Sequence, residues 1–317
     1  MAIKLTETVE KIAACIQLAT LLEVSAYPKP GNVHRMADFP ETKYEHFLAS
    51  TVALASPFKY GAKRGVEVTT GKIKSDEIEI GKVIKDAVVN VSEWQHGGNT
   101  LLGAIFLLSP ISVAAGMTFV EESFSVAKLR EKLKVVVECS TPTDAVDVYD
   151  AILVAKPEGL GKVPRLDVTD PAARQMILDE KITLLDVFEM SSGYDSVAYE
   201  WVNNYLITFD LGYPHLAKQL NEGRDINTAT VQTFLKILSE VPDTFIVRKV
   251  GISKAKEVSL KAGEALEKGG LLTSEGRSYI QKFDREIRDP AHKLSPGTTA
   301  DIVTAVLAVS ILNGYRP

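Results

Sequence analysis

The stretch "LSPGTTADIVTAVLAVSIL", residues 294–312, decides the fold that we expect for this chain. A Pro-Gly turn at 296–297 is followed by Thr298 and Thr299, which can cap the free amide groups at a helix start. Asp301 is then expected in the first helical turn. The residues beyond it are apolar on nearly every side, which is typical of a helix in the middle of a core. The polar entrance is either a simple cap or a site for a phosphate or for an acid that binds a metal.

A second segment, "EWQHGGNTLLGAIFLLSPISVAAG" at 93–116, has the same design. Four small or polar residues precede its apolar run: Gly97, Gly98, Asn99 and Thr100. The glycines allow close backbone approach, and Gly103 leaves room for a neighbouring helix. The run is short for a membrane span and contains Pro110, so we expect a second central helix and no membrane association.

Composition limits the class of protein. The chain has 317 residues, is 45% hydrophobic and carries a net charge of -5. These values exclude disorder and argue against a general nucleic-acid binder. Cys15 and Cys139 lie in apolar surroundings and indicate reduced packing residues, and the five histidines show no zinc spacing. The N-terminus carries no signal pattern, so we expect a cytoplasmic protein.

Helical periodicity dominates the chain. Representative stripes are Val9, Ile12, Ala13 and Ile16, and later Tyr279, Ile280, Phe283 and Ile287. The strand-like runs at 66–70 and 134–139 have no obvious partner, so we interpret them as a loop and a helix end. The pattern predicts an all-α, compact multi-helix bundle with central apolar helices, in one domain over 1–317. The irregular stretch 156–171 is either a functional loop or a boundary.

Polar residues gather in the loop "EVSAYPKPGNVHR", residues 23–35. Its prolines stiffen the chain, Gly31 permits an unusual turn, and Lys29 and Arg35 supply positive charge. This combination suits a phosphate-rich ligand, or equally a rigid connection between helices with solvated basic residues.

Three further segments supply acids and bases: "DVTDP" with Asp167 and Asp170, "DSVAYEW" with Asp195 and Glu200, and "DTFIVRKVG" with Asp243, Arg248 and Lys249. Each has a plain alternative, because Asp170 before a proline is an ordinary helix cap and the third segment could be a solvated helix face. Together they offer acids for a hard cation and bases for phosphates.

Three motifs, taken together, resemble the triphosphoribosyl-dephospho-CoA synthase family, in the form of an archaeal-type member. The family patterns PKPGLVDR, TGGVNTHKGAIF and NPGASADLLAA are similar to residues 28–35, 97–106 and 295–305, in the same order. The first pattern follows a Glu-Val pair, here Glu23 and Val24. The resemblance implies an all-α fold and the production of a prosthetic-group precursor.

The chain departs from these patterns at polar positions. His34 stands where the family has aspartate, and Leu101 and Leu102 replace a His-Lys pair. The family segment HxDM is absent, and "KYEHFLAS", residues 43–50, occupies its region. These departures leave the substrate open while the outline of the site is retained.

The resemblance implies a reaction in which a hydroxyl of dephospho-CoA displaces adenine from the ribose of ATP. It implies Mg²⁺ on the phosphates, with Asp301 and Glu23 as the residues that hold the metal or act as base. The expected substrate-binding residues are Lys29, Gly31, Asn32, Arg35, Gly97, Gly98, Asn99, Thr100, Thr298 and Thr299.

Three functions stay open at this point. The first is a (tri)phosphoribosyl transferase acting on dephospho-CoA or another hydroxyl acceptor. The second is a Mg²⁺-dependent hydrolase of a nucleotide or ribosyl phosphate, and the third is a helical protein that binds a nucleotide without catalysis. A homodimer is compatible with the sequence.

Overall fold

The computed structural model describes residues 2–120, 124–157 and 160–317, and these residues form helices and loops without a strand. A single isolated bridge joins His34 and Ala37. The predicted all-α class is therefore confirmed.

The helices up to residue 202 are α1 (Ala2–Ser25), α2 (Tyr44–Ala53), α3 (Ala55–Thr69), α4 (Ile80–Trp94), α5 (Leu102–Phe119), α6 (Val126–Glu138), α7 (Pro142–Ala155), α8 (Pro171–Asp179), α9 (Leu184–Ser191) and α10 (Ser196–Val202). Those that follow are α11 (Tyr213–Asn221), α12 (Ile226–Glu240), α13 (Thr244–Val250), α14 (Ile252–Glu267), α15 (Ser274–Ile287) and α16 (Gly297–Leu312). Short 3-10 turns cover Ser75–Glu77 and Gly270–Leu272, and a π-helical segment covers Ile207–Gly212.

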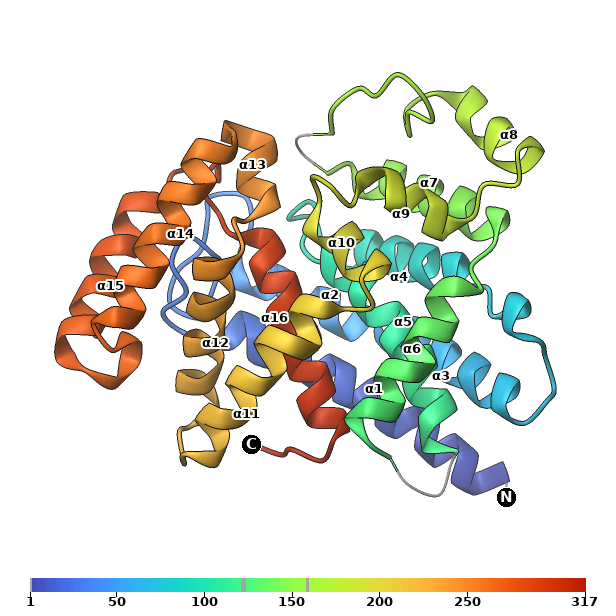
Figure 1. The fold of residues 1–317 in the computed structure, drawn as a ribbon, viewed down its shortest axis with the longest axis horizontal. Coiled ribbons are helices and arrows are strands. Elements are labelled where there is room, and N and C mark those ends of the chain that lie inside the picture. Colours follow the sequence, from blue (N-terminus) through green and yellow to red (C-terminus); the bar gives the residue numbers. More distant parts are fainter. Residues whose placement is uncertain (1, 121–123, 158–159) are drawn as a thin grey trace.

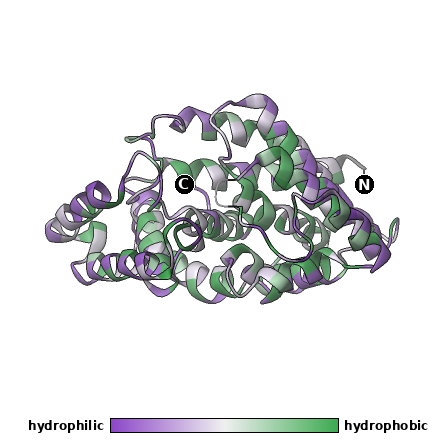
Figure 2. Cartoon of the chain, turned by 90° about the horizontal axis from the view of Figure 1, so that it is seen from above, coloured by the Kyte–Doolittle hydropathy of each residue, from purple (hydrophilic) through white to green (hydrophobic). Residues whose placement is uncertain are grey.

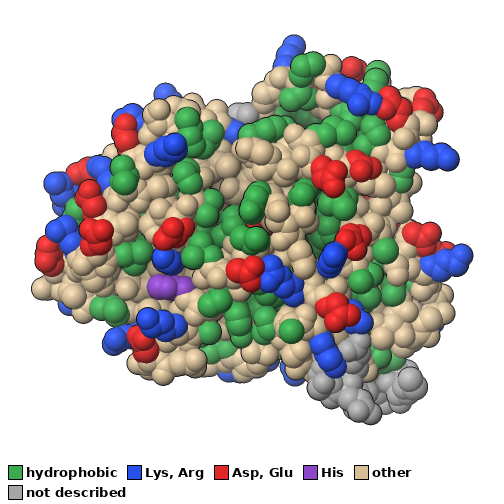
Figure 3. Space-filling view, in the orientation of Figure 1, with side chains coloured by type: hydrophobic (Ala, Val, Ile, Leu, Met, Phe, Trp, Pro, Cys, Tyr) green, Lys and Arg blue, Asp and Glu red, His purple; other side chains and the backbone are tan. Residues whose placement is uncertain are grey.

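Three helices form the centre of the molecule. Figure 1 shows α12, α14 and α15 on one side and α3, α4 and α6–α9 on the other, with α1, α5 and α16 between them, and these three contact one another. Apolar residues concentrate in the inner helices and hydrophilic residues in the outer ones (Figure 2). On the face drawn in Figure 3, lysine and arginine side chains are interspersed with acidic ones.

The predicted central helix near Gly103 is α5. Among the described residues it is the one helix long and apolar enough to cross a membrane, yet 89% of it is buried inside the protein. Pro110 lies within it, and the Ser109 and Ser112 hydroxyl groups donate to the Ile105 and Ser109 carbonyl oxygens at 2.7 and 2.6 Å. Because protein surrounds α5 on all sides, burial in the core explains the apolar composition of this helix.

The start of α16 differs from the prediction in two respects. The helix begins at Gly297, so Asp301 lies in the second turn and not the first. Neither threonine accepts a capping hydrogen bond; Thr299 instead donates to another side chain, described below. The end follows the expected pattern, since α16 stops at Leu312 and Gly314 adopts a φ of 103°.

The expectation of a loop at 66–70 is wrong, because α3 continues through Thr69. Val66 is buried there, and helical packing outweighs the local alternation of apolar residues. Residues 134–138 end α6, as expected. In the stretch 156–171, residues 158–159 lie outside the described residues, and Asp170 caps α8 with Pro171 in its first turn. The Tyr149 hydroxyl donates to the Leu166 carbonyl oxygen at 2.7 Å and holds the stretch to α7.

Candidate active site

A buried ion pair joins the end of α1 to the loop that follows it. Glu23 and Lys29 are 5% and 1% exposed, and the Lys29 ammonium donates to Glu23 Oε1. Burial raises the pKa of Glu23 and lowers the pKa of Lys29, while the charge of each partner opposes the shift of the other. Lys29 therefore faces Glu23 and not solvent, and the phosphate contact expected from the sequence stays a prediction.

Asp301 lies where α16 approaches the start of α5. A Cβ atom on Gly103 would overlap the Asp301 carboxylate, so the glycine provides the space in which this side chain lies. The Ala104 amide, in the first turn of α5, donates to Asp301. Although it is deeply embedded, Asp301 keeps part of its surface exposed, whereas Glu23 is buried. Of the predicted pair, Asp301 is therefore the residue that keeps accessible surface.

Asp243 performs the capping that was expected of the threonines. Its Oδ2 accepts from the Thr299 amide at 2.7 Å and from the Thr299 hydroxyl at 2.8 Å. Its Oδ1 accepts from the amides of Phe245 and Ile246 at 2.9 and 3.2 Å, at the start of α13. At 2% exposure, Asp243 does not lie on a solvated helix face, which the sequence left open.

A second set of contacts joins α10 to α13 and α16. Asp195 caps α10 through the Val197 and Ala198 amides at 2.8 and 3.2 Å, and it forms an ion pair with Arg248 of α13. The Thr244 hydroxyl accepts from the amide of Ser196 at 3.1 Å and lies 3.3 Å from the hydroxyl of Thr298. Thr298 is 4% exposed and faces this network, so its side chain serves packing between helices.

The charges of three other carboxylates act on Asp301. Burial raises the pKa of Asp301 well above its usual range, and the charges of Glu23, Asp243 and Asp195 raise it further, against donation from Ala104. Lys29 and Arg248 are the cations paired with these four carboxylates. A surplus of negative charge around a partly exposed carboxylate is the environment expected of a cation site.

The residues present fit Mg²⁺ only in part. Within the described parts of the chain, no group of three or more His, Cys, Asp or Glu side chains has the arrangement of a metal centre. Mg²⁺ is commonly bound by one or two carboxylates together with water and substrate phosphates. Asp301 fits that mode, and Glu23 fits it less well because its carboxylate is occupied by Lys29.

The glycine turn before α5 is held by its own side chains. Gly98 has a φ of 76°, and Gln95 accepts from the Gly97 amide at 2.5 Å and donates to the Gly98 carbonyl at 2.8 Å. Asn99 accepts from the Leu102 amide at 3.1 Å, and the Thr100 hydroxyl lies 2.7 Å from the hydroxyl of Ser50. Of these four predicted residues, Gly98 and Asn99 are exposed, whereas Gly97 is buried.

Gly31 and Asn32 tie the first loop to the helices around it. Gly31 has a φ of 74°, and its amide donates to Asp284 at 2.8 Å. Asn32 donates to the Pro296 carbonyl at 3.1 Å and accepts from the Ser295 hydroxyl at 2.9 Å, just before α16. Both residues therefore position the loop in this structure. Arg35 is exposed and donates to Asn227 of α12 at 3.3 Å.

Arg288 is a residue of this region that the sequence reasoning missed. It donates to the Asn32 carbonyl at 2.6 Å and to Asp284 at 3.0 Å, and it lies 3.3 Å from His34 Nε2. Burial and the charge of Arg288 lower the pKa of His34 to about 4, so the imidazole is neutral at pH 7. Little in the local sequence around Arg288 marks it, because two of its partners, Asn32 and His34, lie more than 250 residues away.

The other segments with paired acids have structural roles. Glu200 is fully buried and accepts from the Ile207 and Thr208 amides at 2.6 and 3.0 Å, which holds the π-helical segment. Burial raises the pKa of Glu200 to about 7. Asp167 accepts from the Thr169 amide at 2.8 Å within its own turn. Neither acid is among the causes of the Asp301 pKa shift.

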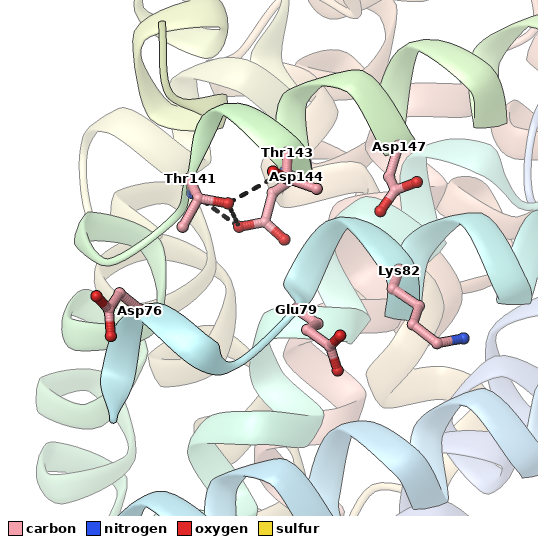
Figure 4. A pocket seen from close by; sticks show the side chains of 7 residues that line it. All are labelled: Asp76, Glu79, Lys82, Thr141, Thr143, Asp144 and Asp147. Atoms are coloured by element: carbon pink, nitrogen blue, oxygen red, sulfur yellow. Dashed lines mark hydrogen bonds between the residues drawn. The ribbon is translucent and has the colours of Figure 1, made fainter. Parts of the chain in front are cut away.

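A groove of about 300 Å³ lies elsewhere, between the starts of α4 and α7 (Figure 4). It is lined by Asp76, Glu79, Lys82, Thr141, Thr143, Asp144 and Asp147. The 15 residues of α4 separate it from the glycine turn that leads into α5, a distance of about 20 Å at 1.5 Å per residue. The groove is therefore distinct from the region around Asp301.

Fold and site together define an all-helical protein in which the starts of two buried helices meet over a cluster of carboxylates. A sequence model of the ATP:dephospho-CoA triphosphoribosyl transferase family matches residues 9–317. The chain belongs to this family, which confirms the resemblance found in its motifs.

Two relatives extend this result. A 2-(5''-triphosphoribosyl)-3'-dephosphocoenzyme-A synthase from Klebsiella pneumoniae is 22% identical over 310 residues, which cover 95% of this chain and 90% of that protein. The crystal structure of a protein from Archaeoglobus fulgidus, described as a candidate triphosphoribosyl-dephospho-CoA synthase, matches with a TM-score of 0.60 and 21% identity. That match covers 85% of this chain and all of the other, and it supports the fold.

Proposed function

We propose that this protein transfers the triphosphoribosyl group of ATP to a hydroxyl acceptor such as 3'-dephospho-CoA and releases adenine. Family membership over nearly the whole chain supports the reaction class. The observation that carries the assignment of the site is Asp301, a partly exposed carboxylate among buried charges at the meeting point of α5 and α16. We place the reaction in the cytoplasm, as the two unpaired cysteines suggest.

In the proposed reaction the acceptor oxygen bonds to the anomeric carbon of the ribose, and the bond from that carbon to adenine breaks. The hydroxyl proton passes to Asp301 when this carboxylate acts as the base, and adenine leaves with a proton from solvent. Glu23, which is paired with Lys29, lies close enough to Asp301 for its charge to act on this carboxyl group. Mg²⁺, when bound through Asp301, supplies charge neutralisation on the triphosphate.

Asp301 has two possible roles, and one variant separates them. Asp301→Asn keeps the size of the side chain and removes its charge. A role as metal ligand predicts that a higher Mg²⁺ concentration restores part of the turnover. A role as base predicts a lower turnover at every Mg²⁺ concentration.

One observation favours a changed acceptor. Leu101 and Leu102, which replace the family's His-Lys pair, are 5% and 9% exposed at the start of α5. With a changed acceptor, the hydroxyl that takes the ribosyl group comes from another molecule or from water.

The test is adenine release from ATP with Mg²⁺, followed by chromatography with and without dephospho-CoA. Adenine that appears only with dephospho-CoA, together with a product heavier by one triphosphoribosyl group, supports the proposal. Adenine with free ribosyl triphosphate shows hydrolysis, and absence of adenine under both conditions contradicts the proposal.

A further inference from the structure

A proline interrupts the hydrogen bonding of α5 close to the candidate site. Pro110 lies inside this helix and has no amide hydrogen, so the carbonyl group four residues before it, that of Phe106, receives no bond from the helix itself. Phe106 lies two residues beyond Ala104, whose amide donates to Asp301. A buried carbonyl group without a partner is costly, so a donor from outside α5 is needed at this point.

The donor belongs to α10. The Trp201 indole donates to the Phe106 carbonyl oxygen at 3.0 Å. The next carbonyl oxygen of α5, that of Leu107, accepts from the Tyr205 hydroxyl, also at 3.0 Å. Trp201 and Tyr205 are 1% and 0% exposed, so both donors are shielded from solvent. Phe188 of α9 packs against the indole, with the ring centres 4.6 Å apart, and limits its movement.

The other end of α10 is attached to α16. The amide of Ser196, the first residue of α10, donates to the Thr244 hydroxyl at 3.1 Å. That hydroxyl lies 3.3 Å from the hydroxyl of Thr298, in the first turn of α16. From Ser196 to Trp201 the helix spans about 8 Å at 1.5 Å per residue. The short helix α10 therefore connects the start of α16 with the second turn of α5, and it contacts both helices.

We propose that Trp201 is a positioning residue of the candidate active site: by holding α5 it places the Ala104 amide against Asp301. The three helices form a closed arrangement, because α10 joins α5 to α16 at one place and the contact between Ala104 and Asp301 joins them at another. Pro110 is part of the same arrangement, since any other residue there would bond the Phe106 carbonyl within the helix. The inference rests on the proposed function, which takes Asp301 as the reacting carboxylate.

The titration of Asp301 tests the inference without an activity assay. In the full chain labelled with ¹³C at the aspartate carboxyl groups, the Asp301 signal is identified by its absence in Asp301→Asn. Burial raises the pKa of Asp301, and the charges of Glu23, Asp243 and Asp195 raise it further, whereas donation from the Ala104 amide lowers it. Loss of this donation therefore raises the pKa of Asp301 above its value in the wild type.

Trp201→Phe removes the indole donor and keeps an aromatic ring in its place. We expect the pKa of Asp301 to rise in this variant, because the Phe106 carbonyl loses its partner and the Ala104 amide moves away from the carboxylate. Trp94→Phe is the matched control, since Trp94 is the other tryptophan of the chain and is 57% exposed, and we expect no change in it. The same Asp301 pKa in folded Trp201→Phe and in the wild type would overturn the inference.

Pro110→Ala separates the hydrogen bond of the indole from the packing of its ring. The amide of the new alanine bonds to the Phe106 carbonyl, so the indole is no longer the donor that this group requires. We expect Trp201→Phe to lower kcat for adenine release at least tenfold in the wild type, and less than threefold when Pro110→Ala is also present. Equal losses in the two backgrounds would show that the ring acts by packing alone, and the inference would be wrong.

The double variant also decides the matter if Trp201→Phe alone fails to fold. A folded protein that carries both Trp201→Phe and Pro110→Ala supports the role of the hydrogen bond, because the helix then supplies the missing donor. If the double variant is unfolded as well, the indole serves packing and the inference is overturned.

The positioning role and the proposed function can fail separately. An Asp301 titration that depends on Trp201 supports the positioning role even if the protein releases no adenine from ATP. Adenine release with an unchanged kcat in folded Trp201→Phe supports the reaction and contradicts the positioning role.

Discussion

Two regions of this molecule bury an aspartate that caps a neighbouring helix, and only one of them has the features of a reaction centre. In the groove at the start of α4, Asp144 is 4% exposed and accepts from the Gly81 amide at 2.8 Å. Near α16, Asp243 is 2% exposed and accepts from the Thr299 amide at 2.7 Å. Burial raises the pKa of both carboxyl groups. A buried, perturbed acid is thus no sufficient sign of function.

The difference lies in what surrounds each cap. Beside the groove, Asp147 and Asp150 are neutralised by Lys85 at 3.0 and 2.8 Å, and Arg174 adds a second contact to Asp150. Near α16, Asp301 remains partly exposed and has the charges of three other carboxylates close to it. The comparison teaches that a partly exposed acid among other carboxylates distinguishes the candidate site, whereas the size of a groove does not.

The largest expected effect on stability is at the Lys29–Glu23 pair. Lys29→Met leaves the Glu23 carboxylate buried without its partner, and we expect a loss of about 3–5 kcal/mol in the free energy of unfolding. Urea denaturation measures this loss. The double variant Glu23→Leu with Lys29→Met removes both charges, and we expect its free energy of unfolding to be close to that of the wild type. A single variant as stable as the wild type would show that the pair is not buried as described.

Glu200, which accepts from two amides of the π-helical segment, should make the stability of the fold depend on pH. Its pKa is about 7 in the fold, above the usual value of 4.5, so the folded state holds a proton that the unfolded state releases between these values. Stability should therefore fall by roughly 3 kcal/mol as the pH rises from 4.5 to 7, and then level off. Thermal unfolding of Glu200→Gln should not show this fall in stability between pH 4.5 and 7. If the stability of Glu200→Gln depended on pH as that of the wild type does, the raised pKa of Glu200 would be contradicted.

Gly103→Ala should impair catalysis more than folding. The added Cβ displaces the end of the Asp301 side chain, which can move, and meets no backbone atom among its nearest neighbours. We expect kcat for adenine release to fall about 10- to 100-fold, since misplacement of a reacting group by about 1 Å has effects of this size. Gly193→Ala is the control, because a Cβ there meets nothing within 4 Å. If Gly103→Ala and Gly193→Ala had the same kcat for adenine release, Gly103 would have no role in the site.

The smallest effect is expected at the groove. Asp144→Asn weakens the cap of α4 and the capping box with Thr141, at a cost of about 1 kcal/mol. Adenine release should stay within twofold of the wild type. If Asp144→Asn stayed folded but lost adenine release, the groove and not the region around Asp301 would be the active site.

The sequence predicted the fold well because α5 and α16 are apolar on all sides, and that pattern is local. It also identified Glu23, Lys29 and Asp301, which the structure brings together. It could not show that Asp243 caps α16, since this contact joins residues 56 apart. Nor could it show that Lys29 is buried, because a lysine in a loop normally faces solvent. Motifs indicate which residue types are present, whereas exposure and pairing arise only when distant segments pack.

The most direct test of the central claim compares one acid from each region in the same assay. Adenine release from ATP, with Mg²⁺ and dephospho-CoA, is measured for the wild type, Asp301→Asn and Asp147→Asn. The account predicts that Asp301→Asn reduces turnover by about 100-fold or more, as expected for loss of a general base, and that Asp147→Asn stays within about twofold. Full turnover by Asp301→Asn, or a large loss in folded Asp147→Asn, would contradict the assignment of the site to the meeting point of α5 and α16.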